Sequence, residues 1–122
     1  MRILLSYLLL FRAIIQACRT PRVQALGLIC MLIALLQALV FSLIEGWGLV
    51  DAFYFAVVSM ATVGYGDLAP ETRLGKLLAI GFLMIGIGVF VLTVSSIAQV
   101  ILKHLEEGEA RNDLIRRRSG RK

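Results

Sequence analysis

The sequence is poor in the residues with which soluble enzymes do their chemistry. Its 122 residues include one histidine and two cysteines, and they contain neither a Walker sequence nor a cluster with the spacing of a metal site. A nucleophile paired with a base is missing as well. These absences argue against an enzyme. Cys18 and Cys30 are too few for a disulfide framework, so both are expected to stay reduced.

Charge is absent from two long stretches of the chain. Residues 23–44 carry none over 22 positions, and residues 77–102 carry none over 26. At about 1.5 Å per residue, a helix of either length crosses the roughly 30 Å hydrocarbon core of a bilayer. A charge at the centre of such a helix would cost about 2.5–3.5 kcal/mol on insertion. The sequence therefore predicts an all-α membrane protein, with an outer helix at 23–44 and an inner helix at 74–105.

Positive charge is concentrated at the two ends of the chain. The sequence has 13 Lys and Arg against 8 Asp and Glu, and the excess lies in residues 1–22 and 103–122. Basic residues flanking the spans predict a multi-pass protein of the cell membrane with both termini in the cytoplasm. The same placement favours contact with anionic membrane lipids over nucleic acid, and no nucleic acid partner is expected. Residues 106–122 are predicted to be a cytoplasmic charged tail.

The first 20 residues have the pattern of an amphipathic helix. At about 100° per residue, five polar residues fall within an arc of roughly 140°; they are Arg2, Ser6, Arg12, Gln16 and Arg19. We expect residues 1–20 to form an interfacial helix on the inner leaflet, separated from the first span by Pro21. A signal peptide and a third span are the alternatives.

Between the two spans lies a short apolar segment, residues 51–61, which is too short to cross a membrane. A re-entrant half-helix explains it best. Asp51 is expected to cap this helix at its start. Non-helical backbone after its end is tolerated at membrane depth only where protein buries it or where it lines water.

The segment after this short helix reads Thr62-Val63-Gly64-Tyr65-Gly66-Asp67. Glycine reaches left-handed dihedral angles cheaply, so the two glycines can help turn successive carbonyl oxygens to one side of the chain. The hydroxyl of Thr62 adds one more oxygen. One chain supplies only one row of oxygens, so several copies around an axis are needed to replace the hydration shell of an ion.

Residues 62–67 resemble the selectivity filter of the potassium channel family. The resemblance covers about residues 23–102 and implies a homotetrameric, potassium-selective channel of the two-span bacterial type, with K+ as the permeant ion. In such a tetrameric ion-channel pore, residues 51–61 would be the pore helix and residues 21–105 the pore domain. It also implies roles for single residues. Thr62, Val63, Gly64 and Tyr65 would coordinate K+; Gly66 and Asp67 would complete the outer mouth; and Tyr54 would hydrogen-bond to Asp67. At Val58 the sequence departs from similar bacterial pores, where a glutamate is common.

Three glycines, Gly81, Gly86 and Gly88, lie within the predicted inner helix, where each costs about 1 kcal/mol relative to alanine. In similar channels a glycine about 20 residues beyond the last filter glycine is a bending point. Gly86 lies 20 residues beyond Gly66 and is the expected hinge. Helical spacing from Gly86 gives four further gate residues, namely Phe90, Val94, Ala98 and Ile101. Close packing by small residues is the alternative, and it suits Gly81 and Gly88 better.

Three other readings stay open. The chain is the pore fragment of a larger, ligand-gated potassium channel whose cytoplasmic regulatory domain is missing from it. Alternatively, it is a less selective cation channel of the same architecture. From a different class, it is a non-conducting regulatory subunit in the membrane. The stimulus that opens the gate is not apparent, since the sequence lacks a voltage sensor with Arg at every third residue.

Overall fold

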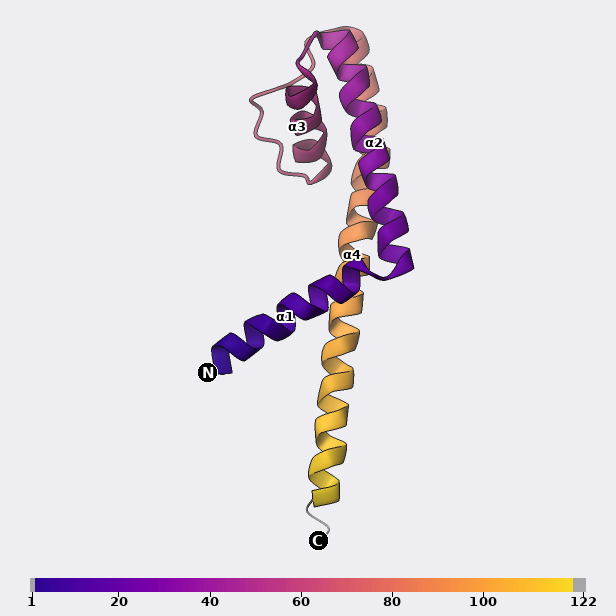
Figure 1. The fold of residues 1–122 in the computed structure, drawn as a ribbon. Coiled ribbons are helices and arrows are strands. Elements are labelled where there is room, and N and C mark those ends of the chain that lie inside the picture. The colour runs from indigo at the N-terminus through magenta and orange to yellow at the C-terminus, as the bar shows by residue number, and fades with distance from the viewer. Residues whose placement is uncertain (1, 120–122) are drawn as a thin grey trace. The chain divides into compact units, whose positions relative to one another are not determined.

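The computed structural model describes residues 2–119, and the regular structure in this range is entirely α-helical (Figure 1). In chain order the helices are α1 (Arg2–Cys18), α2 (Pro21–Glu45), α3 (Leu49–Met60) and α4 (Arg73–Ser119). Helices α2 and α4 contain long apolar stretches, and the short α3 lies between them in sequence. The predicted all-α fold, with two long apolar helices and a short middle one, is confirmed.

The helices begin and end near the expected residues, with one large difference. Helix α2 starts at Pro21, two residues before the predicted 23, because proline suits the first turn of a helix, where its missing N–H is not needed. Helix α4 continues without a break to Ser119. Residues 106–119 of the predicted charged tail therefore extend the inner helix. This continuation agrees with the high helix propensity of the Leu, Glu, Ala and Arg residues that follow residue 103.

The chain divides into two compact units. One comprises Gln24–Val94, and the other comprises Met1–Val23 together with Ser95–Lys122. In the unit Gln24–Val94, a cluster of aromatic rings joins the helices. Phe41 of α2 is fully buried. Its ring centroid lies 5.1 Å from that of Phe55 in α3, 5.9 Å from Trp47 and 6.3 Å from Phe82 in α4. These ring pairs, at separations that favour aromatic contacts, fix α3 against both long helices.

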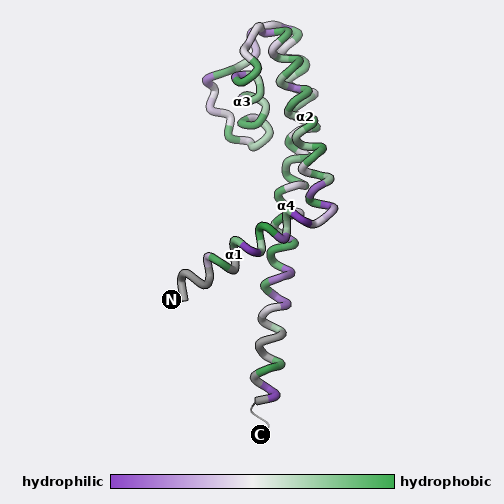
Figure 2. Tube along the Cα trace, viewed as in Figure 1, coloured by the Kyte–Doolittle hydropathy of each residue, from purple (hydrophilic) through white to green (hydrophobic). Residues whose placement is uncertain are grey.

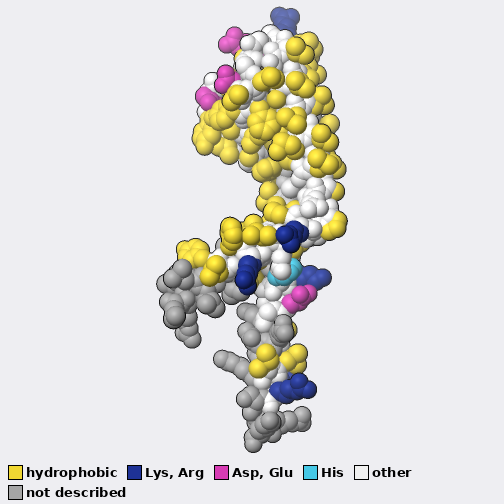
Figure 3. Space-filling view, in the orientation of Figure 1, with side chains coloured by type: hydrophobic (Ala, Val, Ile, Leu, Met, Phe, Trp, Pro, Cys, Tyr) yellow, Lys and Arg dark blue, Asp and Glu magenta, His cyan; other side chains and the backbone are white. Residues whose placement is uncertain are grey.

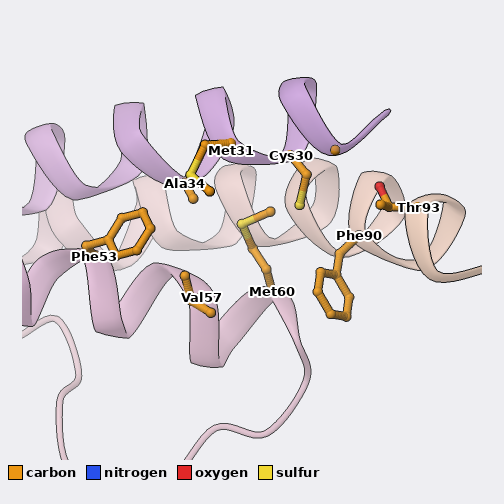
Figure 4. A pocket seen from close by; sticks show the side chains of 9 residues that line it. Cys30, Met31, Ala34, Phe53, Val57, Met60, Phe90 and Thr93 are labelled. Atoms are coloured by element: carbon orange, nitrogen blue, oxygen red, sulfur yellow. The ribbon is translucent and has the colours of Figure 1, made fainter. Parts of the chain in front are cut away.

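Met60, the last residue of α3, centres a second cluster in the same unit. It is 1 % exposed and packs with Ala34, Ala56 and the half-buried Phe90. Beside it lies an apolar cavity of about 200 Å3, to which α2, α3 and α4 all contribute side chains (Figure 4). The end of α3 is thus held between the two long helices.

The outer surface of this unit is apolar. Hydrophobic residues run along α2, α3 and the first part of α4 (Figure 2), and their side chains cover the face shown in Figure 3. Only 22 % of the most apolar window of α2, and 11 % of that of α4, is buried inside the chain. The core helix of a soluble protein would be mostly buried, so these faces suit lipid or neighbouring apolar helices.

A tight turn leads from α2 into α3. Gly46, directly after the end of α2, has a φ of +70°, the left-handed conformation in which glycine commonly ends helices. The hydroxyl of Ser42 donates a 2.8 Å hydrogen bond to the carbonyl of Trp47 across this turn. The prediction that Asp51 caps α3 is wrong. Gly48 is the N-cap, without a side-chain cap, because its extended backbone starts the helix before Asp51, which lies in the first turn.

A carboxylate from the end of α2 binds the start of α4. Glu45 accepts a 2.9 Å hydrogen bond from the backbone N–H of Glu71 and weaker ones, at 3.3 and 3.4 Å, from that of Thr72. The hydroxyl of Thr72 also donates to Glu45. That hydroxyl in turn accepts a 2.9 Å hydrogen bond from the backbone N–H of Gly75. Glu45 and Thr72 therefore satisfy backbone donors that α4 leaves free at its beginning.

This arrangement is a capping box whose two halves come from different helices. In a local capping box, a glutamate three residues after the N-cap residue binds the N-cap N–H. Here Gly75 occupies that third position, and Glu45, which is 30 residues earlier, provides the carboxylate. A Cβ atom on Gly75 would collide with Glu45 Oε1. A side chain at residue 75 would therefore displace the Glu45 carboxylate from its hydrogen bonds.

In the other unit, α1 divides its surface into three sectors. Ala13 and Ala17 are buried at 7 % and 0 % exposure, and both lie on one face, four residues apart. Arg12 and Arg19 are exposed on a second face. Large apolar side chains are exposed on the third face, next to the basic one; they are Tyr7, Leu8, Phe11, Ile14 and Ile15.

Replacing Gly75 with alanine should destabilise the fold. The added methyl group would push the Glu45 carboxylate away from the start of α4, and loss of a helix cap typically costs about 0.5–2 kcal/mol. The midpoint of thermal unfolding in detergent micelles should therefore fall. Gly81→Ala is the matched control, because nothing lies within 4 Å of its added Cβ. Equal midpoints for the two variants would contradict the contact between Glu45 and α4.

Candidate functional site

Residues 62–67 form a non-helical segment that starts two residues after α3 ends. In Figure 1 the chain leaves the end of α3, turns, and runs back beside α3 on the side away from α2. Helix α3 and the returning segment belong to the same compact unit. This is the re-entrant course that the sequence predicts for a short helix followed by an irregular segment.

The backbone of the segment is left-handed at every second residue. The φ angles are +59° at Thr62, +54° at Gly64 and +78° at Gly66. The expectation of left-handed glycines is confirmed, whereas the conformation of Thr62 was not foreseen. For a β-branched residue this conformation is an outlier that costs on the order of 1–3 kcal/mol. Such strain persists only where the surrounding contacts fix the backbone.

Hydrogen bonds to α3 fix the first part of the segment. The backbone N–H of Thr62 donates to the carbonyl of Ser59 at 3.0 Å. The carbonyl of Val58 accepts two hydrogen bonds, from Val63 at 3.0 Å and from Gly64 at 3.3 Å. The last turn of a helix has carbonyls without partners inside the helix. In α3 two of these carbonyls hold the backbone of the segment.

These hydrogen bonds also set the direction of the carbonyl oxygens. In a planar trans peptide the N–H of one residue and the C=O of the residue before it point in opposite directions. The structure has no cis peptide bond among its described residues. Because the N–H groups of Val63 and Gly64 point at α3, the carbonyl oxygens of Thr62 and Val63 point away from it. Two consecutive oxygens are thus presented on the outer side of the segment.

At the other end of the segment, Asp67 lies close to Tyr54 of α3. Burial first, and then the neighbouring Asp67 carboxylate, raise the pKa of the Tyr54 phenol above its usual value. A phenol with a raised pKa stays protonated and remains a hydrogen-bond donor for the carboxylate. The structure thus brings together the pair that the resemblance to potassium channels implies.

In the single chain the side chains of the segment are largely exposed. Val63 is 52 % and Tyr65 71 % exposed. Nothing lies within 4 Å of a Cβ placed on Gly64 or on Gly66. An apolar and an aromatic side chain are therefore left uncovered at a strained backbone.

The predicted gate residues lie on α4, which passes through Gly86 as a regular helix. Phe90 packs against Met60 at the apolar cavity, to which Thr93 also contributes (Figure 4). Val94 and Ala98 are exposed in the single chain, and Ile101 is half-buried. The structure places these side chains without testing a gate, so the gate stays a prediction.

The three glycines of the inner helix differ in how closely other residues of the same chain approach them. Gly81 and Gly88, the two that suit the packing alternative better, have open space around them within the chain. Gly86 is buried, and a Cβ atom there would lie 2.9 Å from Met60 Cγ. Within one chain, therefore, Gly86 is the glycine that allows α3 to approach α4 closely.

Sequence reasoning missed two groups that support the site. One is the pair of α3 carbonyls, at Val58 and Ser59, that hold the segment. Main-chain acceptors have no side-chain signature, although any helix end that points into a membrane offers them. The other is the capping of α4 by Glu45. A charged residue directly after an uncharged run, together with Thr-x-x-Gly at residues 72–75, was the available signal.

Comparison with known proteins identifies the class to which this arrangement belongs. A family model described as "Ion channel" matches residues 28–103, which include most of α2, all of α3, the irregular segment and the apolar part of α4. The chain belongs to this ion channel family. Membership also confirms that it is a membrane protein of the potassium channel type and not an enzyme.

Relatives within the family are named potassium channels. "Potassium channel protein 1" of Methanocaldococcus jannaschii is 38 % identical over 76 residues, which cover 62 % of this chain and 23 % of that protein. "Two pore potassium channel a" of Oryza sativa subsp. japonica is 48 % identical over 56 residues, covering 46 % and 16 %. The chain thus spans less than a quarter of the length of either relative.

A solved structure shares the fold. A calcium-activated cation channel from Tsukamurella paurometabola superposes with a TM-score of 0.62 and is 26 % identical in sequence. The superposition covers 70 % of this chain and 84 % of that one. The arrangement of two long helices with a short helix between them is therefore that of an ion channel pore.

A double-mutant cycle between Gly86 and Met60 tests whether this glycine serves close packing. Gly86→Ala should destabilise the fold by about 1–3 kcal/mol, because the new methyl group would collide with Met60. Gly88→Ala, with open space, is the control. In thermal unfolding, Gly86→Ala combined with Met60→Ala should cost less than the sum of the single changes. Strict additivity of the two changes would argue against the packing role.

Proposed function

We propose that four copies of the chain surround one axis and form a potassium-selective pore, in which Thr62, Val63, Gly64 and Tyr65 coordinate the ion. The observation that carries this proposal is the backbone of the filter segment, residues 62–67. Three of its N–H groups, at residues 62–64, are bound to α3, and its first two carbonyl oxygens point away from that helix. Rings of such oxygens replace the hydration shell of a permeating K+ ion, which moves down its electrochemical gradient.

The outer end of the filter is held by Gly66, Asp67 and Tyr54. The left-handed φ of Gly66 turns the chain out of the filter, and the Asp67 carboxylate lies beside the phenol of Tyr54. This pairing ties the outer mouth to α3. The ring of Tyr65 is exposed in one copy and would pack between subunits in the tetramer.

Gating takes place at the inner helices in this proposal. Gly86 would let α4 bend, while Phe90, Val94, Ala98 and Ile101 would face the ion pathway below the filter. The exposure of Val94 and Ala98 in one chain supports a position on an open face of α4. Gly86 would then serve both close packing and bending, since a position without a side chain suits either.

The termini are proposed to lie in the cytoplasm, with α1 on the inner leaflet. Its exposed apolar sector lies next to its basic sector, which is the surface of a helix lying at the boundary of a membrane with anionic lipids. Residues 1–20 would thus form an interfacial segment, followed by the pore domain at 21–105 and a cytoplasmic extension of α4.

Two alternatives have specific support. The solved relative is a calcium-activated cation channel, which favours a pore that is less selective than the filter sequence implies. The two Methanocaldococcus jannaschii relatives match over only 23 % and 24 % of their own lengths. That difference favours a pore that works together with a separate regulatory domain. A non-conducting regulatory subunit is the third alternative.

Ion selectivity tests the proposal directly. In planar bilayers with K+ on one side and an equal concentration of Na+ on the other, the reversal potential should be displaced far from zero, in the direction that opposes the flow of K+ out of its own side. Gly64→Ala adds a Cβ into open space but forces a side chain onto a left-handed backbone, at a cost of about 1–2 kcal/mol. The native filter conformation should become roughly 5- to 30-fold less populated, with a matching loss of K+ current.

Gly27→Ala is the control for this measurement, because Gly27 lies in α2 and also has open space around it. It should conduct like the unmodified chain. Equal permeability to K+ and Na+ would overturn selectivity and favour the cation channel. If liposomes containing the chain show no barium-sensitive K+ flux in any lipid, pH or calcium condition, the result would favour the non-conducting regulatory subunit.

A further inference from the structure

The two spans end at cations that border one cavity. Arg22 is the last charged residue before the uncharged run 23–44, and Lys103 is the first after the run 77–102. Both line a cavity of about 170 Å3. The cavity lies entirely within the unit formed by Met1–Val23 and Ser95–Lys122. Since charges flanking an apolar run mark the edge of the hydrocarbon, the cavity lies at the level of the lipid headgroups.

The wall of the cavity combines apolar surface with polar groups. Thr20, Arg22 and Val23 contribute from the junction of α1 and α2. One face of α4 supplies the rest, at helical spacing: Ser96, Gln99, Val100 and Lys103. The seven lining residues include two cations and no carboxylate. The wall thus offers two positive charges that no lining side chain neutralises.

Other charges nearby belong to the surroundings of the cavity. Arg19 precedes it on the same side and is exposed. Glu106 and Glu107 follow Lys103 by one turn of α4, and both are exposed and outside the lining. On the face shown in Figure 3, Lys and Arg side chains gather beside the single histidine of this unit, with an acidic side chain next to it. The lining of the cavity therefore carries only positive charge, and the carboxylates that follow on α4 lie outside it.

We propose that this cavity binds the phosphate group of an anionic phospholipid. Guanidinium and ammonium groups are the usual donors to phosphate, and the Gln99 amide provides a neutral donor at the same wall. Val23 and Val100 border the cavity with apolar surface, which suits the glycerol and upper acyl part of a lipid and leaves inorganic phosphate without complementary contacts. The bound lipid joins the start of α2 to α4.

Lipid binding to the purified full chain tests this site. In native mass spectrometry, phosphatidylglycerol should bind more tightly than phosphatidylcholine with the same acyl chains. A cation beside an anionic lipid contributes about 1 kcal/mol, so Arg22→Gln and Lys103→Gln should each weaken phosphatidylglycerol binding about fivefold. Arg117→Gln removes the same charge from an exposed position far along α4, and it should leave the affinity unchanged.

Two further measurements keep the test decisive. Val100→Phe fills the cavity but keeps both cations, so it should also weaken phosphatidylglycerol binding. Far-UV circular dichroism should show the same helix content for every variant. An equal loss for Arg117→Gln and for the two cavity variants would overturn the site, because bulk charge alone would then explain binding.

A competition experiment separates a lipid from a soluble phosphate. Millimolar inorganic phosphate should fail to displace phosphatidylglycerol, and displacement would overturn the assignment to a lipid. The measurement does not involve ion flux. A chain that conducts no K+ but binds phosphatidylglycerol through Arg22 and Lys103 would therefore contradict the proposed pore and support this lipid site.

Discussion

The site depends on one constraint, which is that backbone polar groups at membrane depth need partners inside the protein. Helix α3 satisfies this constraint for the filter segment with carbonyls that its own last turn leaves free. Val58 and Ser59 accept hydrogen bonds from three successive N–H groups, those of Thr62, Val63 and Gly64. Because peptide units are planar, the same hydrogen bonds send the opposite carbonyls outward. Anchoring the backbone and orienting its oxygens are thus consequences of the same contacts.

An anchor of this kind positions the filter only if α3 itself is fixed. Three contacts in the unit Gln24–Val94 fix α3, and each acts at a different place along the helices. The ring of Phe41 holds the middle of α3 against the long helices, and Met60 fits the end of α3 against the bare backbone at Gly86. Glu45 then binds the start of α4 to the end of α2, so the helices on either side of α3 are joined at that end. Loss of any of these contacts would displace the carbonyls that hold the filter.

Local rules in the sequence predicted the helices, the short middle helix and the left-handed glycines, because each depends on neighbouring residues. The features that were missed depend on contacts between distant segments. Glu45 and Thr72 are 27 residues apart, and no local pattern shows that one caps the helix begun by the other. The close packing at Gly86 depends on Met60 from another helix. Thr62 was missed for a different reason, since propensity alone disfavours a left-handed β-branched residue. Asp51 was misjudged because an aspartate side chain suits an N-cap, whereas the backbone at Gly48 starts the helix earlier.

The strain at Thr62 bears on the proposed assembly. Left-handed residues alternate with others at 62, 64 and 66, a period of two that can keep successive carbonyls on one side of the chain. Two of these residues are glycines, for which the conformation is cheap, and the third carries a cost of about 1–3 kcal/mol. In one copy a hydrogen bond to the end of α3 restrains Thr62, while the neighbouring Val63 is half exposed. Neighbouring subunits that cover Val63 and Tyr65 would add the burial that offsets this cost. The filter conformation and the tetramer would then stabilise each other.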